Sequence, residues 1–285
     1  MAEPRVALVT GAARGIGAAT VAHLVSQGYR VVAVDACHGG SEATREDLDA
    51  VVAAGRAAGL DVVGPSGDGS DGAGPAGPDA GTDPGRVVGV VADVRDADAL
   101  TAAVQRALDT WGRLDAVVGA AAVLRGGKPL WETDPADLDL LWNVDAVGLV
   151  NLARAAIPTF LAQPDPTGCR FVALVSAAGT RGLFHLGAYS IAKHAALGVV
   201  RALAADLVGT GVSAIAVSPG STRTDMLQQT AEVYRLNSGE DLAEHQLIHR
   251  LLEPAEIAEV IGLCCSVGGA ALNGSVVEAG GGFRG

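Results

Sequence analysis

The chain has 285 residues and a formal net charge of −12, and apolar residues make up 49% of it. This acidic balance repels phosphate backbones and anionic lipid, so we expect neither nucleic acid nor a membrane as a partner. The four cysteines lack metal-ligand spacing, the longest apolar run (residues 116–124) is too short to span a bilayer, and no signal peptide is visible. We therefore expect a cytoplasmic protein with reduced core thiols and no metal site.

Short runs rich in β-branched residues alternate along the chain with longer alanine-rich stretches. Each run is almost continuously apolar, which is typical of parallel strands covered on both faces. The alternation predicts one α/β domain over residues 1–285, with a doubly wound, Rossmann-type sheet of seven parallel strands and helices on both faces. The expected strands are residues 6–10, 30–34, 87–91, 116–118, 171–175, 213–217 and 275–278.

The first strand runs into a glycine-rich turn that opens a helix. Glycines at such a turn let the backbone approach a pyrophosphate, and the helix N-terminus offers unpaired N–H groups to it. The spacing is G-x-x-x-G-x-G, which is weak evidence alone in a chain with 39 glycines. Its position between a strand and a helix strengthens the prediction of a dinucleotide site. The predicted cofactor-binding residues of this turn are Gly11, Arg14, Gly15, Ile16 and Gly17.

Asp35 ends the next strand, 20 residues after Gly15. A carboxylate there accepts hydrogen bonds from the adenosine ribose and repels a 2′-phosphate, at a cost of roughly 1–4 kcal/mol depending on the dielectric. Arg14 has the opposite effect, because a basic residue at its position can pair with that phosphate. We give Asp35 the greater weight and predict NAD as the cofactor.

A segment of unusual composition follows. Between residues 64 and 85, 12 of 22 residues are glycine or proline, and no basic residue balances the four aspartates. Such a segment buries too little apolar surface to offset its ordering entropy, so we predict a flexible insertion between a helix over residues 41–58 and the third strand. A tolerated surface loop is the favoured interpretation, and a lid over the cofactor is the alternative. After the third strand, Asp93 and Val94 suit the adenine ring, although Asp93 could equally be a buried capping residue.

Ser176, Tyr189 and Lys193 form a second group of polar residues. Tyr189 and Lys193 are four residues apart on an expected helix over residues 188–208, so they share one face. A tyrosine has an ordinary pKa near ~10, and a neighbouring ammonium together with a cationic nicotinamide favours the phenolate. Ser176 ends the fifth strand, at the sheet edge where open α/β sheets bind ligands. This group predicts general acid–base catalysis by Tyr189.

These motifs, with the run Pro219-Gly220-Ser221-Thr222-Arg223-Thr224, resemble the short-chain dehydrogenase/reductase family over nearly the whole chain. The resemblance implies an oxidoreductase that transfers hydride between NAD and an alcohol or carbonyl compound. It implies that Ser176 positions the substrate oxygen, that Tyr189 moves the proton, and that Lys193 lowers the Tyr189 pKa and binds the nicotinamide ribose. It also implies that Pro219, Gly220, Thr222 and Thr224 contact the cofactor.

The chain departs from the family pattern in two places. Gly119-Ala120-Ala121-Ala122 replaces Asn-Asn-Ala-Gly after the fourth strand, which keeps the backbone path but removes bracing side chains. We therefore still assign Ala120 and Ala121 to the cofactor site. Asp145 stands where the family has a catalytic asparagine that orders a water beside the lysine, and we expect Asp145 to take that role.

A narrower likeness concerns Asp35-Ala36-Cys37, the long second crossover, and residues 181–186 and 246–253. These resemble the mycofactocin-associated dehydrogenases, which implies NAD held without ready exchange and a mycofactocin-type redox carrier as a partner. The alternatives are an ordinary reductase that exchanges free NAD(P)H and a non-catalytic NAD-binding sensor.

Residues 221–252 should form a substrate lid. Its apolar residues favour an apolar alcohol, or they simply pack the lid on the core; they are Met226, Leu227, Tyr234, Leu236, Leu247 and Ile248. His185 either borders the pocket or, as the favoured interpretation, lies on the surface. The long helices expected over Pro135–Leu161 and residues 188–208 are apolar on more than one face, so we predict a homotetramer with two-fold axes, or at least a dimer.

Overall fold

Seven parallel strands form one sheet in the order β3-β2-β1-β4-β5-β6-β7, with neighbours in parallel register. The computed structural model describes residues 3–39, 42–58 and 85–284. The predicted doubly wound sheet is confirmed, and the order of the strands reverses between β1 and β4. The strands are β1 (Val6–Thr10), β2 (Arg30–Asp35), β3 (Val87–Val91), β4 (Ala116–Gly119), β5 (Arg170–Leu174), β6 (Ser213–Pro219) and β7 (Val276–Ala279).

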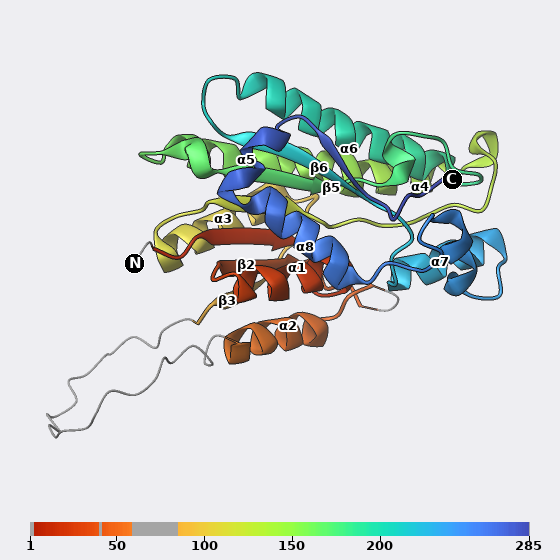
Figure 1. Cartoon of the computed structure of the whole chain (residues 1–285), viewed down its shortest axis with the longest axis horizontal. Helices are drawn as coiled ribbons and strands as arrows, with labels where there is room; N and C mark the ends of the chain where they lie inside the picture. The colour runs from red at the N-terminus through yellow and green to blue at the C-terminus, as the bar shows by residue number, and fades with distance from the viewer. Residues whose placement is uncertain (1–2, 40–41, 59–84, 285) are drawn as a thin grey trace, which may run out of the picture.

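Helices cover both faces of this sheet, as Figure 1 shows. The main helices are α1 (Gly15–Ser26), α2 (Arg45–Ala58), α3 (Ala97–Trp111), α4 (Pro135–Leu141), α5 (Gly148–Leu161), α6 (Gly187–Asp206), α7 (Asp225–Tyr234) and α8 (Pro254–Cys265). Successive side chains of β1 point to opposite faces, because the side-chain period of a strand is two. Leu8 packs in the cluster formed with α3, α5 and α6, whereas Ala7 and Val9 pack in the cluster formed with α1 and α8.

The helix expected over Pro135–Leu161 is interrupted. A π-helical turn, η2 (Trp142–Val147), separates α4 from α5 and carries Asp145 into the interior. The 27-residue segment is long and apolar enough to cross a membrane by length and composition alone, yet 56% of its apolar window is buried in the fold. Leu149, Leu152 and Phe160 belong to the core cluster with α3, so the apolarity of the segment is used within the domain.

Some boundaries differ from the sequence-based expectation. Helix α2 begins at Arg45 instead of residue 41, because Thr44 and Asp47 form reciprocal hydrogen bonds at its first turn. The predicted insertion, residues 64–85, lies outside the described residues apart from Gly85. Cys169, Cys264 and Cys265 are buried free thiols as expected, whereas Cys37 is only half-buried.

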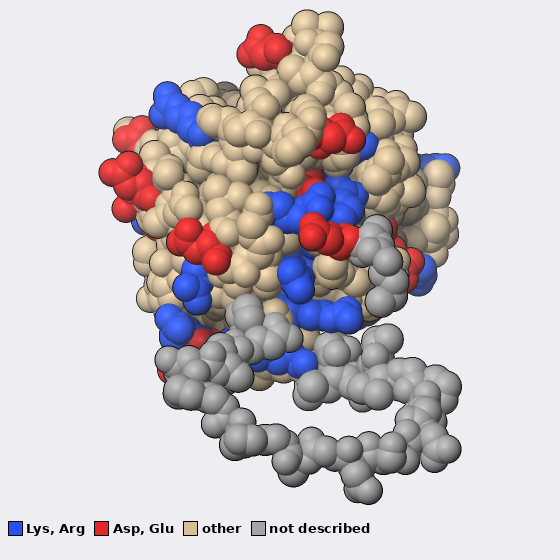
Figure 2. All heavy atoms as spheres, turned by 90° about the vertical axis from the view of Figure 1, so that its left-hand side faces the viewer, with Lys and Arg blue, Asp and Glu red and all other residues tan. Residues whose placement is uncertain are grey.

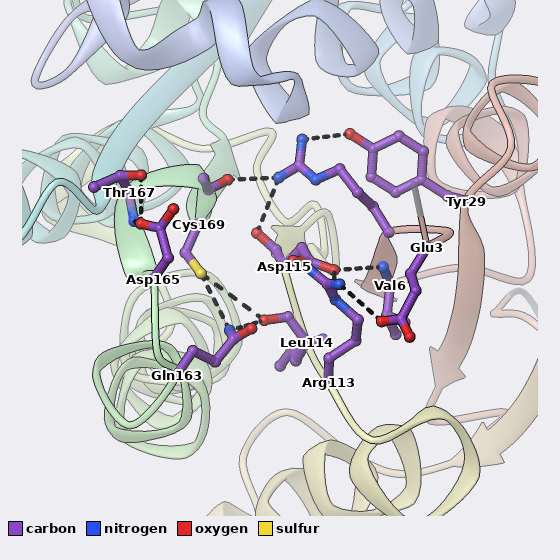
Figure 3. Close-up of polar contacts among 12 residues, drawn as sticks. Glu3, Val6, Tyr29, Arg113, Leu114, Asp115, Gln163, Asp165, Thr167 and Cys169 are labelled. Atoms are coloured by element: carbon purple, nitrogen blue, oxygen red, sulfur yellow. Dashed lines mark hydrogen bonds and ion pairs between the residues drawn. The ribbon is translucent and has the colours of Figure 1, made fainter. Parts of the chain in front are cut away.

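A polar network closes the amino edge of the sheet (Figure 3). Arg5 donates to the Tyr29 hydroxyl at 2.9 Å and to the Cys265 carbonyl at 2.8 Å, and Asp115 accepts the Val6 N–H at 2.8 Å. Arg170 is fully buried and donates to backbone carbonyls just after α8 and before β5. Viewed from outside, this side of the molecule shows basic side chains gathered near its centre, with acidic ones around them (Figure 2). The hydrogen bonds of Arg5, Asp115 and Arg170 connect the loops at the amino edge of the sheet. The opposite, carboxyl edge carries no part of this network.

Candidate active site

A cavity of about 990 Å³ opens at the carboxyl edge of the sheet. The ends of β1, β2, β4, β5 and β6 reach it, at the point where the strand order reverses, and α7 covers one side. Ligands of open α/β sheets bind at this point. All of the predicted cofactor-binding residues line the cavity: Gly11, Arg14, Gly15, Ile16, Gly17, Asp35, Asp93, Val94, Ala120, Ala121, Tyr189, Lys193, Pro219, Gly220, Thr222 and Thr224.

The glycine-rich turn fits a pyrophosphate. Gly11 has a positive φ of 65°, and a Cβ built there would lie 2.7 Å from the Ala121 nitrogen. A Cβ on Gly17 would overlap the Gly11 carbonyl oxygen. Helix α1 begins at Gly15, so its free N–H groups lie beside this cradle. Side chains at Gly11 and Gly17 would therefore break the close backbone packing that shapes this turn.

Thr10 braces the loop after β4. Its hydroxyl accepts the N–H groups of Ala120 at 3.2 Å and Ala121 at 3.3 Å. The loop has no asparagine, and one threonine hydroxyl ties its backbone to β1. This loop therefore keeps its place in the cavity wall without the family side chains.

Asp35 is fixed by two backbone donors. Its Oδ2 atom accepts the Ala13 N–H at 3.1 Å, and its Oδ1 atom accepts the Cys37 N–H at 3.2 Å. Each carboxylate oxygen retains a further lone pair for a ligand hydroxyl. The carboxylate thus has a set orientation at the end of β2, suited to a ribose diol.

Asp93 is a half-buried, ion-paired residue at the cavity wall. Its carboxylate contacts Arg95 at 2.5 Å and His38 at 3.1 Å, and its side chain is 24% exposed. The hydrogen bond from Arg95 lowers the pKa of Asp93 to about 2. The carboxylate also accepts the Arg95 N–H at 2.8 Å, so it does cap the loop, but it is not buried as the capping interpretation expected.

Asn151, which supports the loop after β3, was not predicted from the sequence. Its side-chain amide donates to the Val94 carbonyl at 3.0 Å and is buried between α5 and the loop after β3. It fixes the backbone that carries Asp93 and Val94. In the sequence, the sign of this role is an asparagine among the apolar residues 148–153 of an expected helix.

Ser176, Tyr189 and Lys193 converge on the inner wall of the cavity. Ser176 follows β5, and its Oγ atom accepts the Ala178 N–H at 3.2 Å. Tyr189 and Lys193 are one turn apart on α6 and both are buried. The Lys193 Nζ atom lies 5.6 Å from the centre of the Tyr189 ring and donates to the Leu174 carbonyl at 3.4 Å.

Asp145 lies behind Lys193 and does not line the cavity. Its Oδ1 atom is 2.7 Å from Lys193 Nζ, and its Oδ2 atom accepts the Val123 N–H at 3.3 Å. Burial raises the pKa of Asp145. Burial lowers the pKa of Lys193, but the Asp145 carboxylate raises it, and together with Tyr189 it leaves that pKa above its ordinary value. Lys193 therefore keeps its positive charge.

The pKa of Tyr189 lies above its ordinary value in this structure. Burial raises it most, and the Asp145 carboxylate also raises it, whereas Lys193 and a hydrogen bond with Ser176 lower it. The sequence-based expectation of a lowered value took account of Lys193 and a cationic nicotinamide. It included neither the burial of Tyr189, which has the largest effect on its pKa, nor the Asp145 carboxylate beside Lys193.

The outer part of the cavity is largely apolar. Met226, Leu227, Tyr234 and Leu236, from the segment expected to form a lid, line it and also pack against buried clusters of the domain. Leu247 and Ile248 do not line it and are 51% and 43% exposed, because the chain after the short helix η5 (Gly239–His245) turns them outward. His185 borders the cavity, which corrects the favoured interpretation of a surface residue.

Phe283 also lines the cavity and was not predicted. Arg181 lies over its ring at 6.0 Å, and the Arg284 N–H donates to the His245 carbonyl at 2.8 Å. These contacts join segments more than 30 residues apart in the sequence. Local patterns could not reveal them.

Known proteins match this chain along most of its length. A model described as short chain dehydrogenase matches residues 5–66, and one described as enoyl-(acyl carrier protein) reductase matches residues 73–284. The short-chain reductase protein NovJ of Streptomyces niveus is 31% identical over 99% of this chain and 95% of its own length. The (−)-trans-carveol dehydrogenase of Rhodococcus erythropolis is 31% identical over 83% of this chain and 77% of its own length. The crystal structure of a carveol dehydrogenase from Mycobacterium avium in complex with NAD has the same fold, with a TM-score of 0.83. The two sequences are 23% identical, and the match covers 98% of this chain and 96% of that chain.

Proposed function

The chain belongs to the short-chain dehydrogenase/reductase family of oxidoreductases, and on this premise we propose that it is an NAD-dependent alcohol dehydrogenase or carbonyl reductase with Tyr189 as acid/base. One observation carries the proposal. Tyr189 shares one cavity with Ser176, the glycine cradle and Asp35, and the Lys193 Nζ atom lies 5.6 Å from the centre of its ring. A proton-transfer group and a dinucleotide site thus share one space.

The proton chemistry follows from the side chains of this wall. In alcohol oxidation the Tyr189 phenolate accepts the hydroxyl proton of the substrate, and in carbonyl reduction the phenol returns it. Ser176 donates a hydrogen bond to the substrate oxygen and keeps it within reach of Tyr189. Lys193 stabilises the phenolate by its charge. When bound, the cofactor would take up the hydride as NAD+ in oxidation and would give it as NADH in reduction.

Asp145 is proposed as a positioning residue for Lys193. The 2.7 Å ion pair fixes Nζ beside the Tyr189 ring, and both side chains are buried. A buried ammonium without such a partner would tend to lose its proton. Asp145 thereby keeps Lys193 charged but also weakens its effect on Tyr189.

The cofactor is proposed to be NAD held by the cradle and by Asp35. Thr222 and Thr224 contribute hydroxyls on the opposite side, and the Thr224 methyl group is close to Gly15. We further propose that the NAD exchanges slowly, as in the mycofactocin-associated subgroup, with a mycofactocin-type carrier as the redox partner. Support comes from the Arg14 side chain, which links the turn after β1 to Asp225 on α7 across the cavity.

The substrate is proposed to be an apolar alcohol or its carbonyl counterpart. Met226, Leu227, Tyr234, Leu236 and Phe283 supply an apolar wall at the outer part of the cavity. The relative from Rhodococcus erythropolis is named as a (−)-trans-carveol dehydrogenase, so a cyclic terpene alcohol is a suitable first probe.

We also propose a cytoplasmic homotetramer. It is supported by the exposed apolar side chains of Trp142 on the π-helical turn, Leu161 on α5 and Ile191 on α6.

Two measurements test this function. Protein purified without added nucleotide is denatured with acid, and the released nucleotide is identified and counted; slow exchange predicts close to one NAD per chain. The native protein is then assayed with carveol and smaller cyclic alcohols in the presence of an artificial electron acceptor. Turnover without free NAD supports the carrier-linked enzyme, and turnover only with added NAD(P) supports an ordinary exchanging reductase. Bound NAD without turnover of any alcohol or ketone would favour a sensor.

A further inference from the structure

We propose that Asp47 on α2 helps to set the cofactor preference, because it holds Arg14 in a position where it cannot bind a 2′-phosphate. This inference rests on the proposed dinucleotide site. It assigns a specificity-determining role to a residue that does not line the cavity.

Arg14 is held chiefly by Asp47. Its Nε atom donates to Asp47 Oδ2 at 2.8 Å, and its NH2 atom lies 2.7 Å from the same oxygen. Its NH1 atom is 3.4 Å from Asp225 Oδ2 on α7. The guanidinium therefore contacts two carboxylates, on α2 and on α7. Arg14 directly follows Ala13, whose N–H binds Asp35, and both Arg14 and Asp35 line the cavity.

Asp47 is itself fixed by α2. Its Oδ2 atom accepts the Thr44 N–H at 2.8 Å and the Thr44 hydroxyl at 2.9 Å, and Thr44 Oγ1 accepts the Asp47 N–H at 3.2 Å. This is a capping box, which explains the conformation of Asp47 as a helix-stabilising residue. The capping box would form without the contact between Asp47 and Arg14. The capping box instead makes Asp47 a rigid anchor, and these donors and Arg14 lower the pKa of Asp47 so that it stays charged.

The other basic residues at this end of the cavity are also paired. His38 and Arg95 both contact Asp93. A 2′-phosphate would therefore meet the repulsion of Asp35 and would also have to separate a guanidinium from Asp47. Because both effects act on the same phosphate, we expect the two substitutions to have non-additive effects on the affinity for NADP. Asp35→Ala alone leaves Arg14 paired with Asp47, and Asp47→Asn alone leaves the repulsion by Asp35.

Exchange of the bound nucleotide against an equal mixture of free NAD and NADP, followed to equilibrium, tests the proposal. We expect Asp47→Asn to lower the Kd for NADP relative to that for NAD by about tenfold, the range of one charge-assisted hydrogen bond. The double variant Asp35→Ala/Asp47→Asn should gain more than the product of the single changes. The NADP:NAD ratio of co-purified nucleotide is the second readout. Asp47→Gln serves as a second variant, because a glutamine at this helix position retains the capping-box acceptor.

Two controls separate this account from a general charge effect. Asp49→Asn removes a carboxylate from the same helix that pairs with Arg45 at 3.0 Å, and it should leave the NADP/NAD ratio unchanged. Arg14→Ala in the Asp47→Asn background should abolish the gain. An equal gain with Asp49→Asn, a gain that persists without Arg14, or an unchanged ratio in both Asp47 variants would overturn the inference. If the wild type bound neither nucleotide, the proposed function itself would fail.

Discussion

Asp145 and Lys193 form a buried ion pair, with 2.7 Å between Oδ1 and Nζ, directly behind the ring of Tyr189. The family asparagine at this position is neutral, so this chain carries an extra negative charge next to its proposed proton-transfer group. The charge keeps Lys193 protonated and raises the pKa of Tyr189. The acidity of Tyr189 therefore depends on three residues together.

Asp145→Asn should move the pH profile of alcohol oxidation toward lower pH by about one unit. The asparagine oxygen still accepts a hydrogen bond from the Lys193 ammonium, and the loss of the negative charge favours the phenolate. The measurement is kcat/KM against pH in the oxidative direction. Asn143→Asp, which adds a carboxylate two residues away on the exposed side of the same turn, is the matched control and should not move the profile. A lower kcat with an unmoved profile in Asp145→Asn would mean that Asp145 is only structural.

Gly17→Ala tests the phosphate cradle. The new methyl group would overlap the Gly11 carbonyl, so we expect the free energy of unfolding to fall by about 2 kcal/mol and the bound NAD to be lost. Gly198→Ala is the control, because Gly198 lies exposed on α6 with no atom within 4 Å of a built Cβ. It should raise stability by about 0.5–1 kcal/mol and keep the nucleotide. Normal NAD content in Gly17→Ala would argue against this cradle.

Asp93→Asn should destabilise the protein in a pH-dependent manner. The pKa of Asp93 is lowered to about 2, so its contribution to stability is present above about pH 4 and lost as the pH falls toward 2. We expect a loss of about 1–2 kcal/mol at pH 7, from denaturant unfolding at fixed nucleotide content, that disappears near pH 2. Asp139→Asn, at an exposed position on α4, should have little effect at either pH. A loss that is equal at pH 7 and pH 3 would contradict the ion-pair explanation.

The sheet could be predicted from the sequence because each buried parallel strand is a continuous apolar run. The expected ends of β1 and β3 match the structure, and the other strands differ by one or two residues. Ser176, Tyr189 and Lys193 were found because two lie at helical spacing and one follows a strand. The structure places all three on one cavity wall.

What could not be predicted depends on contacts between distant residues. The Arg14–Asp225 pair spans 211 residues, and Phe283 reaches the cavity only because the chain after β7 returns to the lid. The π-helical turn at Trp142–Val147 leaves no mark in the apolar pattern, which reads as one continuous helix. Leu247 and Ile248 belong to the segment expected to form the lid but do not line the cavity, and composition alone cannot tell which way a loop side chain points.

The proposed homotetramer is testable by light scattering. Trp142, Leu161 and Ile191 are each at least 40% exposed in the single chain, and exposed apolar side chains on neighbouring helices favour association. The predicted mass is about four times the 28.4 kDa of the chain. A mass near 28.4 kDa at micromolar concentration would contradict the prediction.

Tyr189→Phe tests the central claim most directly. Phenylalanine keeps the ring beside Lys193 but cannot exchange a proton, so turnover of the best alcohol substrate should fall by about 10²-fold or more at saturation. The NAD content, measured on the same preparation after acid release, should stay within about twofold of the wild type, because the cradle and Asp35 are untouched. Tyr234→Phe, at the other tyrosine of the cavity wall, should keep most of the activity. If Tyr189→Phe kept most of the wild-type turnover with NAD bound, Tyr189 would not be the acid/base.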